Sequence, residues 1–530
     1  MGPVEQFEFI LLLLVAVLCL EIVSRWLRLP PAAALIIGGG ALTFVPGMPE
    51  FSLDPDLVLV LFLPPLLMAS AYFTAWREFR RNLGGILQLA VGAVAFTTLA
   101  VGLVARWAVP DLPWAACFAL GAVVSPPDAV AAKAVLERVV LPRRTMVLLE
   151  GESLLNDAAG IVLFRFATAA AMTGTFSAWQ AAAAFGVLAV GGAVAGAAVG
   201  FLGVRLLRLL KNAELGILTT LLMPWASYIA AERLHASGVI AVVVSGLILG
   251  WYQHEIFSAN GRRMGSAVWQ VTTYLLEAFV FVLIGLSLHD VSARLGGTGD
   301  ALLALGPPVA AVVAAVVASR FAWILAADRV RFLFRRRRGA AAERASLAAS
   351  VVMGWAGMRG VVTLAVALSL PEGMPGRDLI LTAAFAVILV TVLVQGTTLA
   401  ALVRLVRIPA EGPLDGRMLS RDQAMSLVAG TQLATVESLS RGPDGGVRHP
   451  RLLEQYGYRA RAMARFSEQA QTLAAERDAH FGVVLAAVAA GRAEVLRLHR
   501  SGRIHDEVLH AVEHDLDLQE LSAGRMRGAA

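Results

Sequence analysis

Long apolar segments follow one another over most of this chain, and each is long enough to cross a lipid bilayer. A spanning helix needs roughly 17–25 mainly apolar residues. With that window the sequence contains thirteen candidates, which lie near residues 7–27, 31–47, 57–74, 85–107, 114–135, 147–171, 180–208, 214–232, 237–251, 270–289, 301–326, 346–370 and 379–405. Hydrophobic residues make up 58% of the chain and charged residues 16%, against about 45–50% and 25% in soluble domains. The sequence therefore predicts an all-α polytopic membrane protein, because runs this long exclude barrel strands.

Basic residues gather in alternate connections between these segments. The basic connections carry Arg25 and Arg28; Arg77, Arg80 and Arg81; Arg138, Arg143 and Arg144; Arg205, Arg208 and Lys211; Arg262 and Arg263; and Arg329, Arg331, Arg335 to Arg338 and Arg344. The connections between them hold acids such as Glu50 and Asp111, or few charges. By the positive-inside rule the N-terminus lies outside and the C-terminus in the cytoplasm, which favours thirteen spans over twelve.

The formal net charge of +6 is not a nucleic-acid signal, because the basic residues sit in short loops. The run Arg335 to Arg338 is interpreted as a cytoplasmic loop anchor rather than a phosphate-binding patch. The two cysteines, Cys19 and Cys117, lie in apolar segments and form neither a disulfide framework nor a metal-ligand cluster. The predicted partner of the chain is the bilayer, with no nucleic acid and no cofactor.

The composition changes near residue 407. Residues 1–407 form the predicted transmembrane domain, and residues 408–530 are rich in Arg, Glu, Gln and His with helical periodicity. We interpret the second part as a mostly helical cytoplasmic tail without catalytic residues. If this tail binds a ligand, we expect its role to be regulatory. Its histidines titrate near neutrality, so pH sensing and simple solvation are both open interpretations.

Two of the predicted spans are interrupted. Pro126 and Pro127 stand in the fifth, where each removes an N–H group and disfavours the helix. In the twelfth, Gly354, Gly357 and Gly360 surround Arg359. The two spans are seven apart, so they take corresponding positions in two six-helix repeats of opposite orientation if the seventh span joins the repeats. Interrupted helices in such positions indicate a transporter's binding site near the middle of the membrane. Chance is the other interpretation, since prolines and glycines are common in membrane helices.

Carboxylates lie beside the first break and in the next span. Asp128 follows the prolines directly, and "GESLLNDAAG" brings Glu152, Ser153, Asn156 and Asp157. Ser153 and Asp157 are four residues apart and share a helix face, as do Glu152 and Asn156 on an adjacent face. Asp157, Ser153, Asp128 and freed backbone carbonyls, including that of Pro127, are oxygen ligands suited to a small hard cation. No His or Cys cluster suggests a transition metal.

Competition for one carboxylate yields a mechanism. Removal from water favours the neutral form of an aspartate, whereas a bound cation favours its ionised form. Asp157, and Asp128 after it, could therefore hold a proton or a cation in turn. If only the neutralised site crosses between its two orientations, the protein exchanges the two species. The alternative for Asp157 is a buried structural acid, but intramembrane acids are functional by default.

Glu152 is predicted to be structural, because a buried acid needs a cation beside it. Arg320 and Arg359 are the intramembrane cations available, and the sequence does not decide between them. It also leaves open whether Glu277 and Glu21, in other spans, serve structure or transport.

Five motifs together resemble the monovalent cation–proton antiporters, in particular the bacterial branch of Na⁺/H⁺ exchangers. They are "FLPPLLMASAYFTAWREFRRN", "SPPDAVAAKAVLER", "LLEGESLLNDAAGIVLF", "HASGVIAVVVSGLILG" and "GWAGMRGVVTLAVALSLP". The resemblance covers roughly residues 5–405 in the right order. It implies thirteen helices with two crossed broken helices, a homodimer, and Na⁺ extrusion across a bacterial inner membrane.

By the same resemblance, the ion-binding aspartates are Asp157 and Asp128, with Ser153 as the site serine. Asn156 beside Asp157 is typical of electroneutral one-for-one exchangers. The ion-pair acid is Glu152, with Arg320 and Arg359 as its basic partners.

Two departures from that family leave the cation open. Pro127 stands where many relatives have Thr, and Ala69 stands where some carry an acid. Na⁺ is the predicted substrate with Li⁺ beside it, and K⁺/H⁺ exchange is the nearest alternative.

A cation channel is a remote alternative, because channels use rings of acids or carbonyls from several subunits. An intramembrane aspartyl protease is more remote still, because neither aspartate follows the Gly-x-Gly pattern that resemblance to that family would require.

Overall fold

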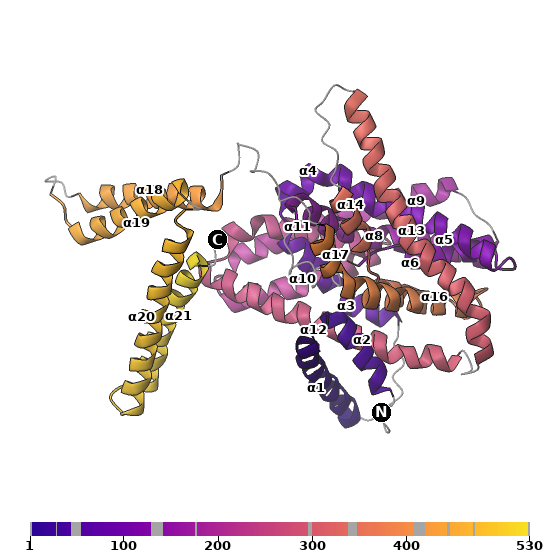
Figure 1. Ribbon diagram of the computed structural model, residues 1–530, viewed down its shortest axis with the longest axis horizontal. Helices are drawn as coiled ribbons and strands as arrows, with labels where there is room; N and C mark the ends of the chain where they lie inside the picture. Colours follow the sequence, from indigo (N-terminus) through magenta and orange to yellow (C-terminus); the bar gives the residue numbers. More distant parts are fainter. Residues whose placement is uncertain are drawn as a thin grey trace. The chain divides into compact units, whose positions relative to one another are not determined.

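A computed structural model describes residues 3–27, 29–43, 55–128, 141–174, 178–294, 299–337, 347–406, 419–441, 446–469 and 472–527. The chain divides into two compact units, which we call the membrane unit, Met1–Ala410, and the tail unit, Glu411–Ala530. Within the described ranges both are helical, apart from one isolated bridge between Arg441 and Val447 (Figure 1). The predicted all-α membrane fold is confirmed.

Helices lie in the described part of every predicted apolar segment. The membrane unit contains α1 (Pro3–Leu27), α2 (Pro31–Leu42), α3 (Pro55–Phe73), α4 (Trp76–Leu87), η1 (Gln88–Ala93), α5 (Val94–Ala108), α6 (Trp114–Val124), α8 (Arg143–Thr173), α9 (Ala178–Leu209), α10 (Ala213–Arg233), α11 (Gly238–Ile256), α12 (Ala259–Arg294), α13 (Gly299–Arg337), α14 (Leu347–Trp355), α15 (Val361–Leu368), α16 (Arg377–Val390), η2 (Thr391–Gln395) and α17 (Gly396–Val406). In the described part, nine stretches are long and apolar enough to span a membrane, and three shorter apolar helices accompany them. The count of thirteen spans stays a prediction.

Several helices extend beyond their predicted spans. The tenth span was expected over 270–289, whereas α12 runs from Ala259 to Arg294, and α13 continues to Arg337. A hydropathy window finds only the apolar part of a helix, while backbone hydrogen bonding continues into polar turns outside the bilayer. Helix starts follow local chemistry: Asn212 accepts from two backbone N–H groups of α10, and Ser237 accepts from the N–H of Ile240 in α11.

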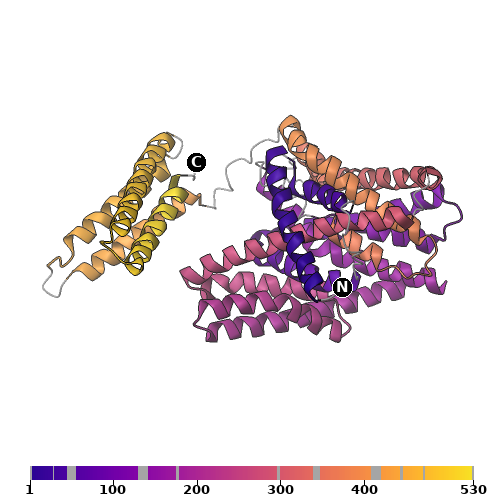
Figure 2. The ribbon, with the colours of Figure 1, turned by 90° about the horizontal axis from the view of Figure 1, so that it is seen from below.

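Small residues let the helices approach closely. A Cβ on Gly39 of α2 would lie 2.3 Å from the carbonyl oxygen of Val282 in α12, and one on Gly285 of α12 would lie 2.3 Å from that of Ile36. A Cβ on Gly196 would similarly meet the carbonyl oxygen of Ala241, where α9 packs on α11. In Figure 2 the helices α9 to α12, drawn in magenta, run alongside one another. Such close backbone contact is how membrane helices associate without a hydrophobic driving force.

The tail unit consists of four described helices that pack as two antiparallel pairs, α18 (Arg421–Ser440) with α19 (Pro450–Glu468) and α20 (Ala474–Arg500) with α21 (Asp506–Arg527) (Figure 1). The two helix pairs are joined by an ion pair between Arg477 of α20 and Asp422 of α18, whose charged atoms lie 3.5 Å apart. Within the second pair Arg527 donates a hydrogen bond to Asp478, which lowers the pKa of that carboxyl group.

Candidate ion site

Both interrupted helices unwind where the sequence predicts. Helix α6 ends at Val124, two residues before Pro126, and residues 125–128 are not helical. Helix α14 ends at Trp355, and helical structure resumes only with Val361 of α15. The two breaks meet, because the N–H of Asp128 donates to the carbonyl oxygen of Met358 at 2.7 Å. Each break therefore provides a hydrogen-bond partner for a backbone group of the other break that has no partner within its own helix. The remainder of the predicted fifth span lies outside the described residues.

Gly360 provides the contact between the second break and the Asp128 carboxyl group. A Cβ at this position would lie 1.8 Å from Oδ2 of Asp128. Only glycine lets that oxygen rest against the backbone at the start of α15. The carboxylate is thus held at a helix N-terminus, where the backbone dipoles stabilise negative charge.

We expect Gly360→Ala to reduce transport by at least about tenfold while the protein still folds, because the added methyl group must displace a site carboxylate. Gly84→Ala is the matched control, since a Cβ on Gly84 meets nothing within 4 Å. Cation-driven proton flux in proteoliposomes measures both variants. Wild-type flux in Gly360→Ala would show that Asp128 need not stay where the structure places it.

Asp157 lies on α8 with only 7% of its surface exposed. Its side chain has no hydrogen-bond partner in the described part of the chain. It is close enough to Asp128 for the two charges to interact. A buried, unpartnered carboxylate beside a second one is costly when ionised, and a cation or a proton would offset that cost.

Asp128, Ser153 and Asp157 line one small cavity of about 40 Å³, as the helical spacing of the last two predicts. Ser70 of α3 and Glu277 of α12 add two further polar groups, and the rest of the lining is mostly apolar. Water needs roughly 10–15 Å³ of such space, so the cavity accommodates a small ion or very few waters. Helix α8 reaches the first break because Gly160 lacks a side chain: a Cβ there would lie 2.3 Å from Cγ of Pro126.

Asn156 and Pro127, both predicted to bind the ion, bind each other. Nδ2 of Asn156 donates to the carbonyl oxygen of Pro127 at 2.5 Å, and neither residue lines the cavity. The Asn156 side chain is fully buried, and its Oδ1 atom has no hydrogen-bond partner among the described residues. In this arrangement Asn156 secures the unwound segment to α8, one residue away from the Asp157 carboxyl group.

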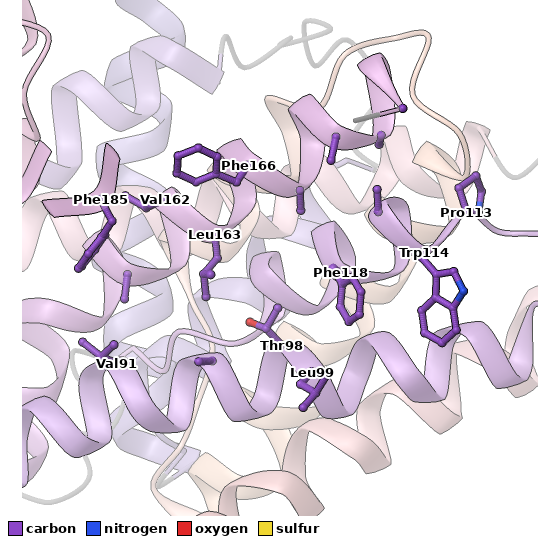
Figure 3. A pocket seen from close by; sticks show the side chains of 17 residues that line it. Val91, Thr98, Leu99, Pro113, Trp114, Phe118, Val162, Leu163, Phe166 and Phe185 are labelled. Carbon is purple, nitrogen blue, oxygen red and sulfur yellow. The ribbon is translucent and has the colours of Figure 1, made fainter. Parts of the chain in front are cut away.

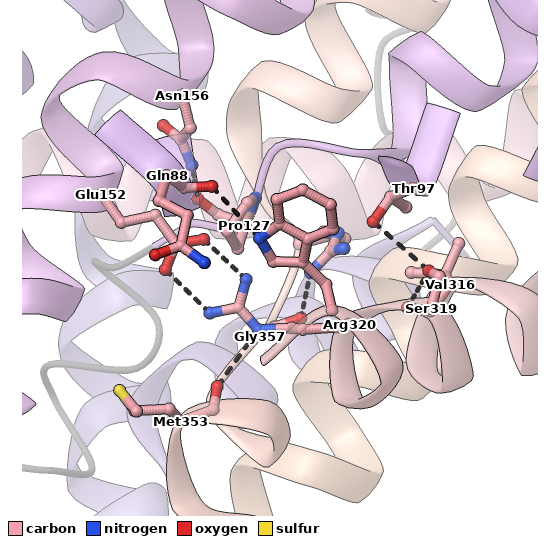
Figure 4. Close-up of polar contacts among 12 residues, drawn as sticks. Gln88, Thr97, Pro127, Glu152, Asn156, Val316, Ser319, Arg320, Met353 and Gly357 are labelled. Atoms are coloured by element: carbon pink, nitrogen blue, oxygen red, sulfur yellow. Dashed lines mark hydrogen bonds and ion pairs between the residues drawn. The ribbon is translucent and has the colours of Figure 1, made fainter. Parts of the chain in front are cut away.

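Glu152 pairs with Arg320 of α13, which settles the choice that the sequence left open. Two hydrogen bonds of 2.7 and 2.9 Å join the guanidinium to the carboxylate, and both residues are almost fully buried (Figure 4). Nε of Arg320 also donates to the carbonyl oxygen of Met353 in α14 at 3.1 Å. A Cβ on Gly357 would lie 2.2 Å from Cδ of Arg320, so this glycine makes room for the pair.

Arg359 donates its side-chain hydrogen bonds to backbone carbonyl groups of the two breaks. Its Nε donates to the carbonyl oxygen of Val124 at 2.7 Å, and its Nη1 donates to that of Gly357. Its backbone N–H donates to Oγ1 of Thr391 at 3.0 Å. Arg359 therefore satisfies carbonyl groups that both breaks release, and the partner of Glu152 among the described residues is Arg320. Thr391 was not predicted, because nothing in the sequence distinguishes it from other membrane threonines.

A larger cavity of about 790 Å³ lies between α5, α6, α8 and α9. Its walls are aromatic and aliphatic, with Thr98 as a polar exception (Figure 3). None of its described lining residues carries a carboxylate. The smaller cavity, which Asp128 and Asp157 line, is therefore the better candidate for a cation site. In the described residues no group of three His, Cys, Asp or Glu side chains is placed to hold a metal ion.

The chain is similar to known proteins over most of its length. Residues 10–405 match the sodium/hydrogen exchanger transmembrane family. An uncharacterized Na⁺/H⁺ exchanger from Mycobacterium tuberculosis is 34% identical over 98% of this chain and 96% of its own. A sodium, potassium, lithium and rubidium/H⁺ antiporter from Bacillus subtilis is 33% identical over 75% of this chain and 61% of its own. Among solved structures, the sodium proton antiporter of Methanocaldococcus jannaschii superimposes with a TM-score of 0.59 at 19% identity, covering 78% of this chain and all of that one.

Proposed function

The chain belongs to the sodium/hydrogen exchanger family, as a multi-pass membrane protein that exchanges a monovalent cation for protons, and we propose that Asp157 and Asp128 form the site for which the two species compete. The observation that carries this proposal is the burial of Asp157, which has no hydrogen-bond partner among the described residues, in a small cavity that Asp128 and Ser153 also line.

Charge neutralisation couples the two species. With the cavity empty, two carboxylates in an apolar surrounding repel each other and are poorly solvated. A proton on Asp157 removes the charge, and a cation held between Asp157, Asp128 and Ser153 compensates it. Both occupied states are therefore better suited to cross between inward-facing and outward-facing forms than the empty ionised state. Exchange follows because one species must leave before the other binds.

The surrounding polar groups hold the two breaks in place during this cycle. Asn156 secures the carbonyl group of Pro127, and Arg359 secures those of Val124 and Gly357. The pair of Glu152 and Arg320 joins α8 to α13, and through Met353 to α14. We assign these residues to structure rather than to ion binding, since none of them lines the cavity.

Sodium is the proposed cation, with Li⁺ beside it and K⁺ as the alternative. A cavity of about 40 Å³ lined by carboxylate and hydroxyl oxygens suits a small hard ion better than a large one. One-for-one stoichiometry is proposed because Asn156 takes the place next to Asp157 where a second aspartate would add another titratable charge. The printed name of the Bacillus subtilis relative includes potassium, so K⁺ belongs in the test.

Proteoliposomes loaded with a pH dye test this function. We expect Na⁺ or Li⁺ added outside to drive protons out of the vesicles, at a rate that does not change when valinomycin in K⁺-balanced vesicles clamps the voltage. A rate that needs the clamp would contradict one-for-one exchange. No response to Na⁺, Li⁺ or K⁺ from folded protein would contradict the proposed site chemistry as a whole.

We propose the membrane orientation and cellular setting of the protein from its loop charges and its relatives. The basic loops support an external N-terminus and a cytoplasmic C-terminus, and the bacterial relatives support a plasma membrane. Family likeness supports a homodimer, which cross-linking in membranes would test. For the tail unit we propose a regulatory role with an unidentified ligand.

A further inference from the structure

Glu277 brings a third carboxylate to the ion cavity from a helix that supplies neither aspartate. It lies half-buried in the apolar part of α12, close in sequence to the buried residues Ala278, Val280 and Phe281. Its side chain lines the cavity together with Asp128 and Asp157. An ionised acid within a membrane-spanning helix costs free energy, and such acids mark ion pathways in membrane proteins. The position of Glu277 on an ion cavity therefore indicates a function in transport.

Helix α12 belongs to a different packing group from the helices that carry the aspartates. It packs mainly on α2, with further contacts to α10 and α3, whereas α8 packs mainly on α6, α4 and η1. The glycine contacts of Gly39 and Gly285 fix α12 against α2 at backbone distance. Because Gly285 is about two turns from Glu277, the carboxylate is carried by a firmly held part of the helix.

The three acids are not gathered around one point. No three acidic side chains in the described residues are close enough to hold an ion together. Glu277 therefore cannot complete the coordination shell of Asp157 and Asp128 in this conformation. It can attract a cation into an otherwise apolar cavity, because a charge in a poorly screened cleft concentrates counter-ions.

We propose that Glu277 is the cation-capture residue of this site, which contacts the cation before or after Asp157 does and sets its apparent affinity. This inference rests on the proposed function, because it assigns a step to the same cavity. A carboxylate with this role binds protons as well, so part of the competition between H⁺ and the cation takes place at Glu277.

The test is the dependence of proton efflux on Na⁺ concentration in proteoliposomes, for wild type, Glu277→Gln and Glu277→Asp. We expect Glu277→Gln to raise the KM for Na⁺ about tenfold with the maximal rate kept within about twofold, the effect of losing one charge-assisted contact. Glu277→Asp is expected to restore most of the affinity. A purely structural role would lower the maximal rate in both variants and leave KM unchanged.

Glu21→Gln is the matched control, since Glu21 is a buried membrane glutamate that pairs with Arg25 and does not line the cavity. Its KM is expected to equal that of wild type. An unchanged KM in Glu277→Gln, with active wild type and inactive Asp157→Asn, would overturn this inference alone. Inactive wild type would instead overturn the proposed function, so the two failures are distinguishable.

Discussion

Replacing Asp157 with Asn is expected to abolish cation-coupled proton movement, leaving only the passive leak of the vesicles. The amide neither binds a transferable proton nor offers a negative charge to a cation. Both halves of the exchange are lost at once, so the rate should fall by roughly 100-fold or more, the scale on which loss of an essential group acts. Dye-loaded proteoliposomes measure this directly.

Asp111→Asn is the control for that variant, because Asp111 is an exposed aspartate between α5 and α6. We expect it to transport like wild type. Asp157→Asn should also elute as folded protein in size-exclusion chromatography, since its new amide replaces a group that has no hydrogen-bond partner in the described part of the chain. Proton efflux well above the leak in folded Asp157→Asn would contradict the assignment of Asp157 as the carrier.

Breaking the pair of Glu152 and Arg320 is expected to have the largest effect on stability. Glu152→Gln leaves the Arg320 guanidinium buried without its counter-charge, and loss of one partner of a buried pair costs about 3–5 kcal/mol. Replacing both, as in the double variant Glu152→Leu with Arg320→Met, should recover much of that cost, because two well-packed apolar groups need no counter-charge. Unfolding in mixed micelles gives the free energies for a double-mutant cycle.

The exposed pair of Arg208 and Glu255 is the matched control for that cycle. Its atoms lie 3.4 Å apart with both side chains largely exposed, so Glu255→Gln should change the free energy of unfolding by only about 0–1 kcal/mol. If Glu152→Gln and Glu255→Gln changed the free energy of unfolding equally, the buried pair would not stabilise the packing of α8 on α13 as its geometry indicates.

Local chemistry explains which features of this fold could be predicted. The positions of the spans follow from runs of apolar residues, and the breaks follow from Pro126 and Pro127 in one helix and from glycines in the other. The shared face of Ser153 and Asp157 follows from helical periodicity alone. Each of these properties depends on residues within a few positions of one another.

Contacts between distant helices could not be predicted in the same way. Arg320 is 168 positions from Glu152, and either arginine satisfied the need for a counter-charge. The need for glycine at position 360 appears only when Asp128 approaches from another helix. Glu277 was left undecided because an acid in an apolar run looks the same whether it faces a cavity or a structural partner. Asn156 was expected at the ion, whereas its amide is used to hold Pro127.

Proton release on cation binding tests the central claim most directly. Purified protein in a weakly buffered solution would be titrated with NaCl while a pH indicator follows the free protons, with choline chloride as the salt control. Competition at Asp157 predicts that Na⁺ displaces protons, that release is largest at low pH where the site is protonated, and that Asp157→Asn releases far fewer protons than wild type. Saturable Na⁺ binding without proton release at any pH would contradict the account, because cation and proton would then occupy separate sites.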